Sequence, residues 1–303
     1  MMDRLAAKHV AMFVIAAALP VGCTQPPQPA AQDERPASTA TLPRSPRAAT
    51  ATASVTTSTS TAPPASREAP PASSQQPGNT SNDSFSRAKK LLKGVYADHR
   101  LTIYCGCAYS AGGELDFTAC GYVPKNDTGR AHRIEWEHVV PAEAFGQSFA
   151  EWRDGHAECV DGKGKRFKGR ECARKASAPF RYMEADMYNL YPEIGELNGL
   201  RSNTTMAEIA GEAHDFGKCD VKLAAGTFEP RPEVRGDVAR TYQYMDAAYP
   251  GHGIISGKNR KLFDAWSAQD PVDAWECERA RLILKIQGNE NGTVAAACRQ
   301  AGL

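Results

Sequence analysis

Eight cysteines between residues 105 and 298 constrain the fold of this chain more than any other feature. They are Cys105, Cys107, Cys120, Cys159, Cys172, Cys219, Cys277 and Cys298. In an exported domain such a set predicts up to four disulfides. Closeness along the chain favours Cys159 with Cys172 and Cys277 with Cys298. Zinc is disfavoured, because a single residue separates Cys105 from Cys107, fewer than in common zinc knuckles.

Residues 1–23 are typical of an export signal, with Arg4 and Lys8 before a short apolar run. The run is too short for a transmembrane span. Cys23 follows it and resembles the cysteine of a bacterial lipoprotein cleavage box, although Pro20 stands where such boxes favour Leu. We therefore expect an exported protein. A lipidated Cys23 would tether it to a membrane, as a periplasmic or outer-membrane lipoprotein, and ordinary cleavage would instead release a secreted protein.

Residues 24–82 consist largely of Ala, Pro, Ser, Thr and Gln. A segment of this composition buries too little apolar surface to offset its chain entropy, so we expect a disordered linker. The folded domain is then predicted to span 83–303, a length that suits one compact unit. Six of the 36 basic and four of the 35 acidic residues lie in 1–82, so charges in the domain nearly balance. Binding of a polyanion would need a local basic patch.

Hydrophobic spacing and helix-breaking residues predict a mixed α+β domain with more helix than strand. Strands are expected over 101–104 and 133–140, the second ending before Pro141, which would open a helix towards Phe149. We expect 153–178 to form a basic loop and 198–205 a polar turn. Helices are expected over 84–97, 181–190, 234–248, 258–267, 272–287 and 292–301.

Glu137 and His138 stand side by side in an otherwise apolar run that ends in Val139, Val140 and Pro141. Burying an acid or a histidine costs several kcal/mol unless it is paired, ligated or used. A satisfied core histidine is the usual interpretation of one isolated His, but it does not account for this pair. His is suited to taking a proton near neutral pH, and a carboxylate is a hard ligand for Mg²⁺.

Asn189 lies in a second informative segment, residues 183–192, close to the helix breaker Pro192. Its amide oxygen is a further hard ligand, so one carboxylate, one amide and several waters would suit Mg²⁺. Helix termination is the alternative role for Asn189. The zinc-protease pattern of His-Glu-x-x-His and the Gly-x-Ser-x-Gly elbow are both absent from the sequence.

The sequence closely resembles the bacterial endonuclease I family, which comprises exported, disulfide-bonded nucleases with a His-Me finger (ββα-metal) site. The resemblance covers about residues 85–300 and implies a single α+β domain built around that motif. It is carried by Tyr104–Cys107, Glu135–Ala142, Phe145–Gly146, Met183–Leu190, Gly195–Arg201 and Trp275–Arg279.

This resemblance implies His138 as the general base that activates water, and Glu137 and Asn189 as direct ligands of one Mg²⁺ ion. Mn²⁺ or Ca²⁺ would be able to occupy the same site. The resemblance further implies hydrolysis of the phosphodiester backbone that leaves 5′-phosphate ends.

An arginine of the cysteine-bearing basic loop is implied to stabilise charge in the transition state, because a planar bidentate donor suits phosphate. The loop carries several extra residues, so Arg170 is favoured and Arg166 and Arg174 remain alternatives. All three are candidates for contacting nucleic acid. Arg201 and Asn203 would either contact phosphate or pin a turn.

The expected partner is DNA, with RNA as a second candidate, bound through phosphates by a monomer. Two other classes compete with this interpretation. A metal-dependent phosphodiesterase for small molecules would need a closed pocket. A tethered nucleic-acid-binding module would bind DNA without cutting it, and would have no use for a base beside a metal site.

Overall fold

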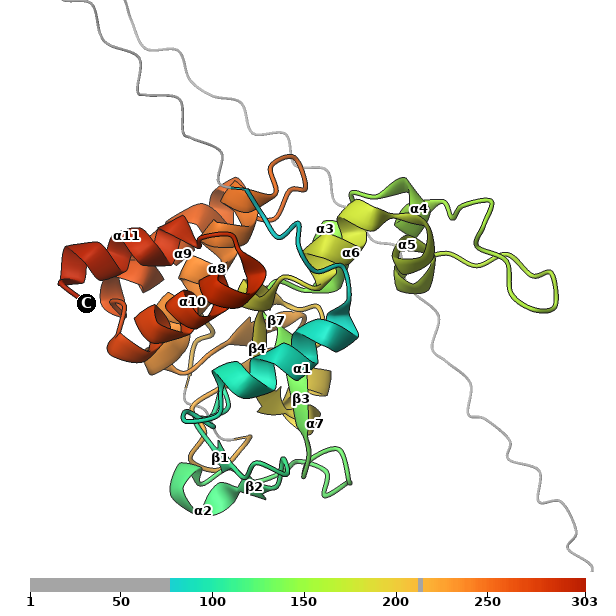
Figure 1. Ribbon diagram of the computed structural model, residues 1–303. Coiled ribbons are helices and arrows are strands. Elements are labelled where there is room, and N and C mark those ends of the chain that lie inside the picture. Colours follow the sequence, from blue (N-terminus) through green and yellow to red (C-terminus); the bar gives the residue numbers. More distant parts are fainter. Residues whose placement is uncertain (1–76, 212–214) are drawn as a thin grey trace, which may run out of the picture. The chain divides into compact units, whose positions relative to one another are not determined.

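The computed structural model describes residues 77–211 and 215–303 (Figure 1). It is a mixed α+β structure, which confirms the predicted fold class. The predictions for the export signal, for Cys23 and for linker residues 24–76 lie outside the described residues. No helix in the described part of the chain is both long and apolar enough to cross a membrane.

The last residues of the predicted linker, 77–82, belong to the fold, so the boundary expected at residue 83 is wrong. Asn79 is 1% exposed and its side-chain amide donates to the backbone oxygens of Asn82 and Tyr182. The hydroxyl of Ser81 donates to the backbone oxygen of Gln287 at 2.6 Å. Small polar residues resemble linker in composition, but here they satisfy buried backbone groups.

An antiparallel strand pair followed by a helix forms the centre of the domain. Strand β3 (Ile134–His138) pairs with β4 (Leu190–Ile194), with Glu137 opposite Tyr191 and His138 opposite Leu190. Helix α7 (Gly195–Arg201) follows β4 directly. This ββα order is the one implied by the family resemblance.

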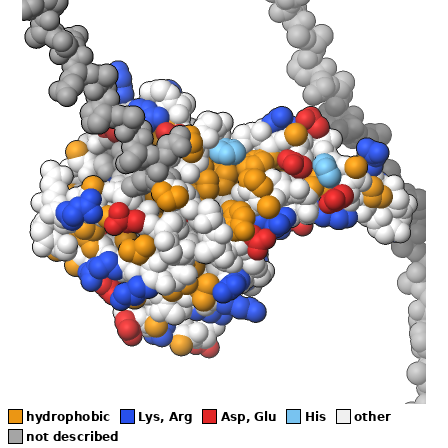
Figure 2. Space-filling view, turned by 45° about the horizontal axis from the view of Figure 1, so that its top comes forward, with side chains coloured by type: hydrophobic (Ala, Val, Ile, Leu, Met, Phe, Trp, Pro, Cys, Tyr) orange, Lys and Arg blue, Asp and Glu red, His pale blue; other side chains and the backbone are white. Residues whose placement is uncertain are grey.

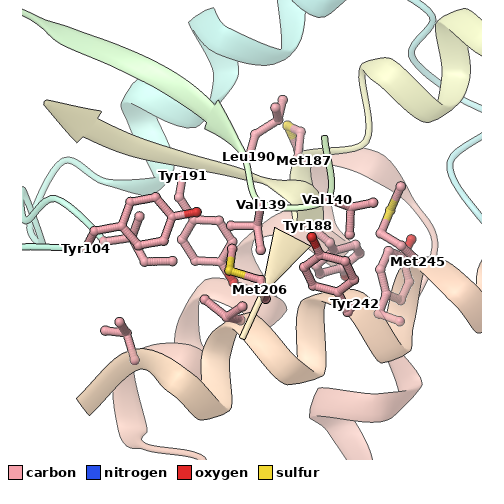
Figure 3. Packing of buried hydrophobic residues seen from close by; sticks show 14 of the residues in the cluster. Tyr104, Val139, Val140, Met187, Tyr188, Leu190, Tyr191, Met206, Tyr242 and Met245 are labelled. Carbon is pink, nitrogen blue, oxygen red and sulfur yellow. The ribbon is translucent and has the colours of Figure 1, made fainter. Parts of the chain in front are cut away.

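Four helices of the C-terminal part pack together on one side of this motif (Figure 1). They are α8 (Arg235–Ala248), α9 (Gly257–Gln269), α10 (Ala274–Gln287) and α11 (Gly292–Ala301). The predictions for these four segments are confirmed within a few residues at each end. In Figure 3 the buried cluster beside β3 and β4 includes Val139, Val140, Tyr242 and Met245.

Helix α1 (Phe85–Val95) confirms the first predicted helix. The hydroxyl of Ser84 caps its first turn by accepting from the backbone N–H of Arg87. Ala88, Leu92 and Val95 repeat at helical spacing and are buried in the core.

The remaining elements are short. They are β1 (Ala108–Tyr109), β2 (Leu115–Asp116), α2 (Phe117–Cys120), α3 (Ala142–Gly146), α4 (Ala150–Arg153), α5 (Arg170–Ala176), α6 (Ala178–Glu184), the 3₁₀ turn η1 (Met187–Asn189), β5 (Thr205–Met206), β6 (Lys222–Ala224), β7 (Thr227–Glu229) and the 3₁₀ turn η2 (Pro232–Val234). In Figure 1, α4 and α5 lie to the right of the strand pair together with the loop that joins them.

All eight cysteines after residue 100 form disulfides. The pairs Cys159–Cys172 and Cys277–Cys298 confirm the prediction from closeness along the chain. The other pairs are Cys105–Cys219 and Cys107–Cys120. The first joins cysteines 114 residues apart and was not predicted, because only the tertiary structure brings such distant segments together.

Three predicted elements are wrong. Residues 101–104 form no strand, and Leu101 makes only an isolated bridge to Ala108. The helix expected over 181–190 ends at Glu184, because Leu190 pairs with His138 in the sheet. Part of the basic loop expected over 153–178 is helical, since α5 and α6 both begin within it.

The polar turn expected over 198–205 is confirmed only at residues 202 and 203, because residues 198–201 belong to α7. Glycine is generally unfavourable inside a helix. Here Gly195 and Gly199 are needed for close packing. A Cβ atom at residue 195 would lie 2.6 Å from the backbone oxygen of Arg130, and one at 199 would lie 2.4 Å from its guanidinium.

Candidate active site

A cleft of about 820 Å³ opens beside β3. Its lining joins acidic, basic and aromatic side chains from β3, from α1, from α5 and from α7. They include Phe85, Lys89, Arg130, Arg133, Glu135, Trp136, Glu137, His138, Trp152, Arg170, Asn198, Ser202 and Asn203. The lining carries four basic side chains, Lys89, Arg130, Arg133 and Arg170, and three acidic ones, Glu135, Glu137 and Glu143. The face of the domain in Figure 2 likewise shows basic and acidic side chains interspersed.

Glu137 lies at the inner end of the cleft and is 3% exposed. Its Oε1 accepts a hydrogen bond from the hydroxyl of Tyr104 at 2.9 Å and lies 3.3 Å from Nε of Arg201. Burial raises the pKa of Glu137 to about 7, while Arg201 opposes that rise. A divalent cation beside this carboxylate would stabilise its ionised form.

His138 is the last residue of β3 and is 8% exposed. Its Nε2 lies 2.9 Å from the backbone oxygen of Glu184. A carbonyl oxygen can only accept, so Nε2 carries the hydrogen and Nδ1 keeps a free lone pair. Its ring centroid lies 4.8 Å from that of Phe85. Burial, together with the charge of Arg170, lowers the pKa of His138 to about 3 and keeps the ring neutral.

Adjacent residues on a regular strand point to opposite faces, so the sequence left open how Glu137 and His138 share a site. The structure shows that both line the cleft, where β3 ends. Val139 and Val140 follow directly and are fully buried. They anchor the strand end in the core while the two polar residues before them face the cleft.

Glu184, at the end of α6, was not singled out by the sequence but organises one end of the site. Its backbone oxygen holds His138, and its buried carboxylate accepts from Nε of Arg170 and Nε of Arg174. These two arginines lower the pKa of Glu184 against the effect of burial. One residue therefore fixes both the imidazole and the neighbouring cationic groups.

Arg170, the arginine favoured from the family resemblance, begins α5 and lines the cleft. Its Nε is held by Glu184. Its Nη2 is buried and has no hydrogen-bond partner among the described residues. A buried donor without a partner is costly, so an acceptor supplied by a ligand would suit this nitrogen.

The structure does not bring Asn189 into the cleft, which corrects its predicted role as a metal ligand. The side chain is fully buried in η1 and bridges the backbone of Val140. Its Oδ1 accepts from the N–H of Val140 at 2.7 Å, and its Nδ2 donates to the oxygen of Val140 at 2.9 Å. The amide oxygen is thus engaged in holding the chain just after His138.

Asn198 of α7 takes the position in the cleft that the sequence had assigned to Asn189. Its Nδ2 donates to Oε2 of Glu135 at 3.0 Å, which turns its Oδ1 away from that carboxylate. Asn198 belongs to the motif Gly195–Arg201, so the family resemblance contained the signal. This role of Asn198 was missed because the sequence predicted a turn over 198–205.

The other predicted nucleic-acid contacts divide into two groups. Asn203 is exposed and lines the cleft. Arg201 is fully buried and donates to the backbone oxygen of Val139 at 2.6 Å, so a phosphate contact for it is wrong. Arg174 is bound to Glu184 and Glu171, and Arg166 is exposed in the loop between α4 and α5; neither lines the cleft.

Residues 79–298 match the family model described as Endonuclease I. The chain is 40% identical over 223 residues to an extracellular deoxyribonuclease of Aeromonas hydrophila, which covers 71% of this chain and 91% of the relative. A periplasmic deoxyribonuclease of the same organism is also 40% identical over 223 residues, covering 71% and 87%. Endonuclease-1 of Buchnera aphidicola subsp. Acyrthosiphon pisum is 36% identical over 222 residues, covering 71% and 82%.

Proposed function

Because this chain belongs to the endonuclease I family, we propose that it is an exported, metal-dependent endonuclease that hydrolyses the phosphodiester backbone of DNA. The convergence of His138, Glu137 and Arg170 on one cleft supports this function above all else. RNA is proposed as a second substrate, since a site that contacts phosphates carries no base readout. We keep the prediction of a monomer.

We propose Glu137 and Asn198 as the direct ligands of one Mg²⁺ ion, with Mn²⁺ or Ca²⁺ able to replace it. One carboxylate and one amide oxygen fit Mg²⁺, which retains several waters. The described residues hold no group of three or more His, Cys, Asp or Glu side chains placed to bind a metal, so a zinc or di-metal site has no support there. When bound, the ion would act as a Lewis acid on the scissile phosphate and offset charge on the leaving 3′ oxygen.

His138 is proposed as the general base through Nδ1. The bond from Nε2–H to Glu184 fixes the tautomer and the orientation of the ring. A phosphate in the cleft brings negative charge beside the imidazole, which raises the pKa of His138 from its value in the free protein. Nδ1 then accepts one proton of a water molecule while the water oxygen bonds to phosphorus and the bond from phosphorus to the 3′ oxygen breaks. The 3′ oxygen leaves with the electron pair of that bond and takes a proton from solvent, and the imidazolium returns its proton to solvent. The products are a 5′-phosphate and a 3′-hydroxyl.

Arg170 is proposed to donate to a non-bridging oxygen of the phosphate. Its unpartnered Nη2 is available for this bond, and its Nε is already fixed by Glu184. A guanidinium held in place before the substrate arrives stabilises developing charge without reorganising.

Digestion of a supercoiled plasmid by the oxidised protein tests this function. We expect cleavage with Mg²⁺, none with EDTA, and a loss of about 10²- to 10⁴-fold in rate for His138→Ala. His252→Ala is the matched control, because His252 stacks on Phe149 outside the cleft. Cleavage of a chromogenic diester but not of plasmid would favour a small-molecule phosphodiesterase. Binding of intact DNA in both conditions would favour a non-catalytic module.

A further inference from the structure

A second pair of arginines, Arg130 and Arg133, lines the cleft at the other end of β3 from Glu184. Both bind Glu135, which is three residues before His138 on the strand. A strand rises about 3.3 Å per residue, so Glu135 lies roughly 10 Å from His138 along β3. The arrangement parallels the one at the opposite end, where Glu184 holds Arg170 and Arg174.

The pair is held in place by several contacts. Glu135 accepts from Nε and Nη2 of Arg130 at 3.0 and 2.8 Å, and from Nε and Nη2 of Arg133 at 3.0 and 2.6 Å. Asn198 also donates to this carboxylate. The guanidinium of Arg130 lies against Gly199, where any larger residue would displace it. These contacts orient both guanidinium groups before any ligand binds.

The charges of this group favour an anion. Two guanidinium groups, each donating two hydrogen bonds to one carboxylate, leave a net charge of about +1. The side chains of Arg130 and Arg133 are 48% and 61% exposed, so solvent and ligands reach them. Glu135 binds neither Nη1, which leaves a donor on each arginine for a phosphate.

We propose that Arg130 and Arg133 bind a second backbone phosphate, a few nucleotides from the one that is cut. This inference rests on the proposed nuclease function and narrows its substrate class to strands with at least one phosphate besides the scissile one. The second phosphate fixes the direction of the strand along β3. Cleavage of a compound with a single phosphate would then be inefficient even where it fits the cleft.

The test compares two substrates, an oligothymidylate eight nucleotides long and bis(4-nitrophenyl) phosphate, which has one phosphate. For Arg133→Ala we expect kcat/KM to fall about 10-fold or more on the oligonucleotide and about 2-fold or less on the small diester, as for loss of one charged hydrogen bond. Glu135 remains paired with Arg130 in this variant, so no carboxylate is left uncompensated. Arg130→Ala is expected to act in the same direction.

Arg260→Ala is the matched control, since Arg260 is 54% exposed, is paired with Asp246 and lies outside the cleft. It removes the same charge and should affect neither substrate. In a His138→Ala background, Arg133→Ala should reduce the salt dependence of oligonucleotide binding by about 0.7 in the logarithmic slope. Equal losses on both substrates, or an unchanged slope, would overturn the second phosphate site while leaving the nuclease function intact. If the unsubstituted protein cuts neither the oligonucleotide nor plasmid, the function itself fails.

Discussion

Nε2 of His138 lies 2.9 Å from the backbone oxygen of Glu184, and the carboxylate of the same Glu184 holds Arg170. The proposed base and the proposed phosphate ligand are therefore fixed by one residue, 46 positions from His138 in the chain. The pairing of β3 with β4 brings these segments together, because it places Leu190 opposite His138.

The first prediction concerns the carboxylate of Glu184. Glu184→Gln keeps the backbone oxygen that orients His138 but removes the charge that holds Arg170 and Arg174. We expect kcat to fall about 10- to 100-fold with a smaller change in KM, because the loss is one of positioning in the transition state. Steady-state kinetics on plasmid or oligonucleotide check this. Unchanged kcat would show that Arg170 needs no carboxylate to hold it.

The second prediction separates the two asparagines. Asn198→Ala should lower Mg²⁺-dependent activity at least 10-fold and raise the Mg²⁺ concentration needed for half-maximal rate, with little change in stability. Asn189→Ala should instead destabilise the fold by about 2–3 kcal/mol, because it leaves the buried N–H and C=O of Val140 without partners. Urea unfolding and Mg²⁺ titrations of both variants are the measurements. The reverse pattern would restore Asn189 as the metal ligand.

The third prediction is a pH dependence of stability. Burial raises the pKa of Glu193 from 4.5 to about 8, although its carboxylate accepts from the N–H groups of Tyr104 and Ile194. The folded state therefore keeps a proton that the unfolded chain loses above pH 4.5. Its contribution to the free energy of unfolding is fully present below pH 4.5 and is lost as pH rises through about 8.

Unfolding in urea at pH 5 and pH 8 checks this third prediction against Glu193→Gln, which cannot ionise. Relative to that variant, the unsubstituted protein should lose about 1–3 kcal/mol between the two pH values. The other buried acids are present in both proteins, so their contributions cancel. A difference independent of pH would mean that Glu193 titrates normally.

The fourth prediction compares two disulfides of similar span. Cys159–Cys172 and Cys277–Cys298 close loops of 13 and 21 residues, so removing either should cost roughly 3 kcal/mol. Cys172 lies on α5, two residues after Arg170, whereas Cys277 lies on α10. Replacing the first pair by serine should therefore lower kcat more than replacing the second. Thermal unfolding and kinetics of the two double variants, at a temperature where both are folded, provide the measurement.

Much of the local structure followed from the sequence alone. The spacing of Ala88, Leu91, Leu92 and Val95, with Ser84 or Ser86 as the cap, predicted α1. Similar patterns predicted α8 to α11, because helix amphipathicity and capping are encoded by neighbouring residues. Glu137 and His138 indicated the site because they are neighbours in the sequence. The two disulfides that close short loops, Cys159–Cys172 and Cys277–Cys298, were also predicted from the sequence.

Tertiary structure alone decided which asparagine faces the cleft and which arginines line it. Asn189 and Asn198 both belong to segments that carry the family resemblance, but η1 turns the first towards Val140 and α7 presents the second to the cleft. The sequence made Arg201 a candidate for contacting phosphate, but the structure shows its side chain buried in the core. These choices depend on contacts between segments tens of residues apart, such as Cys105 with Cys219, and no local pattern of residues encodes them.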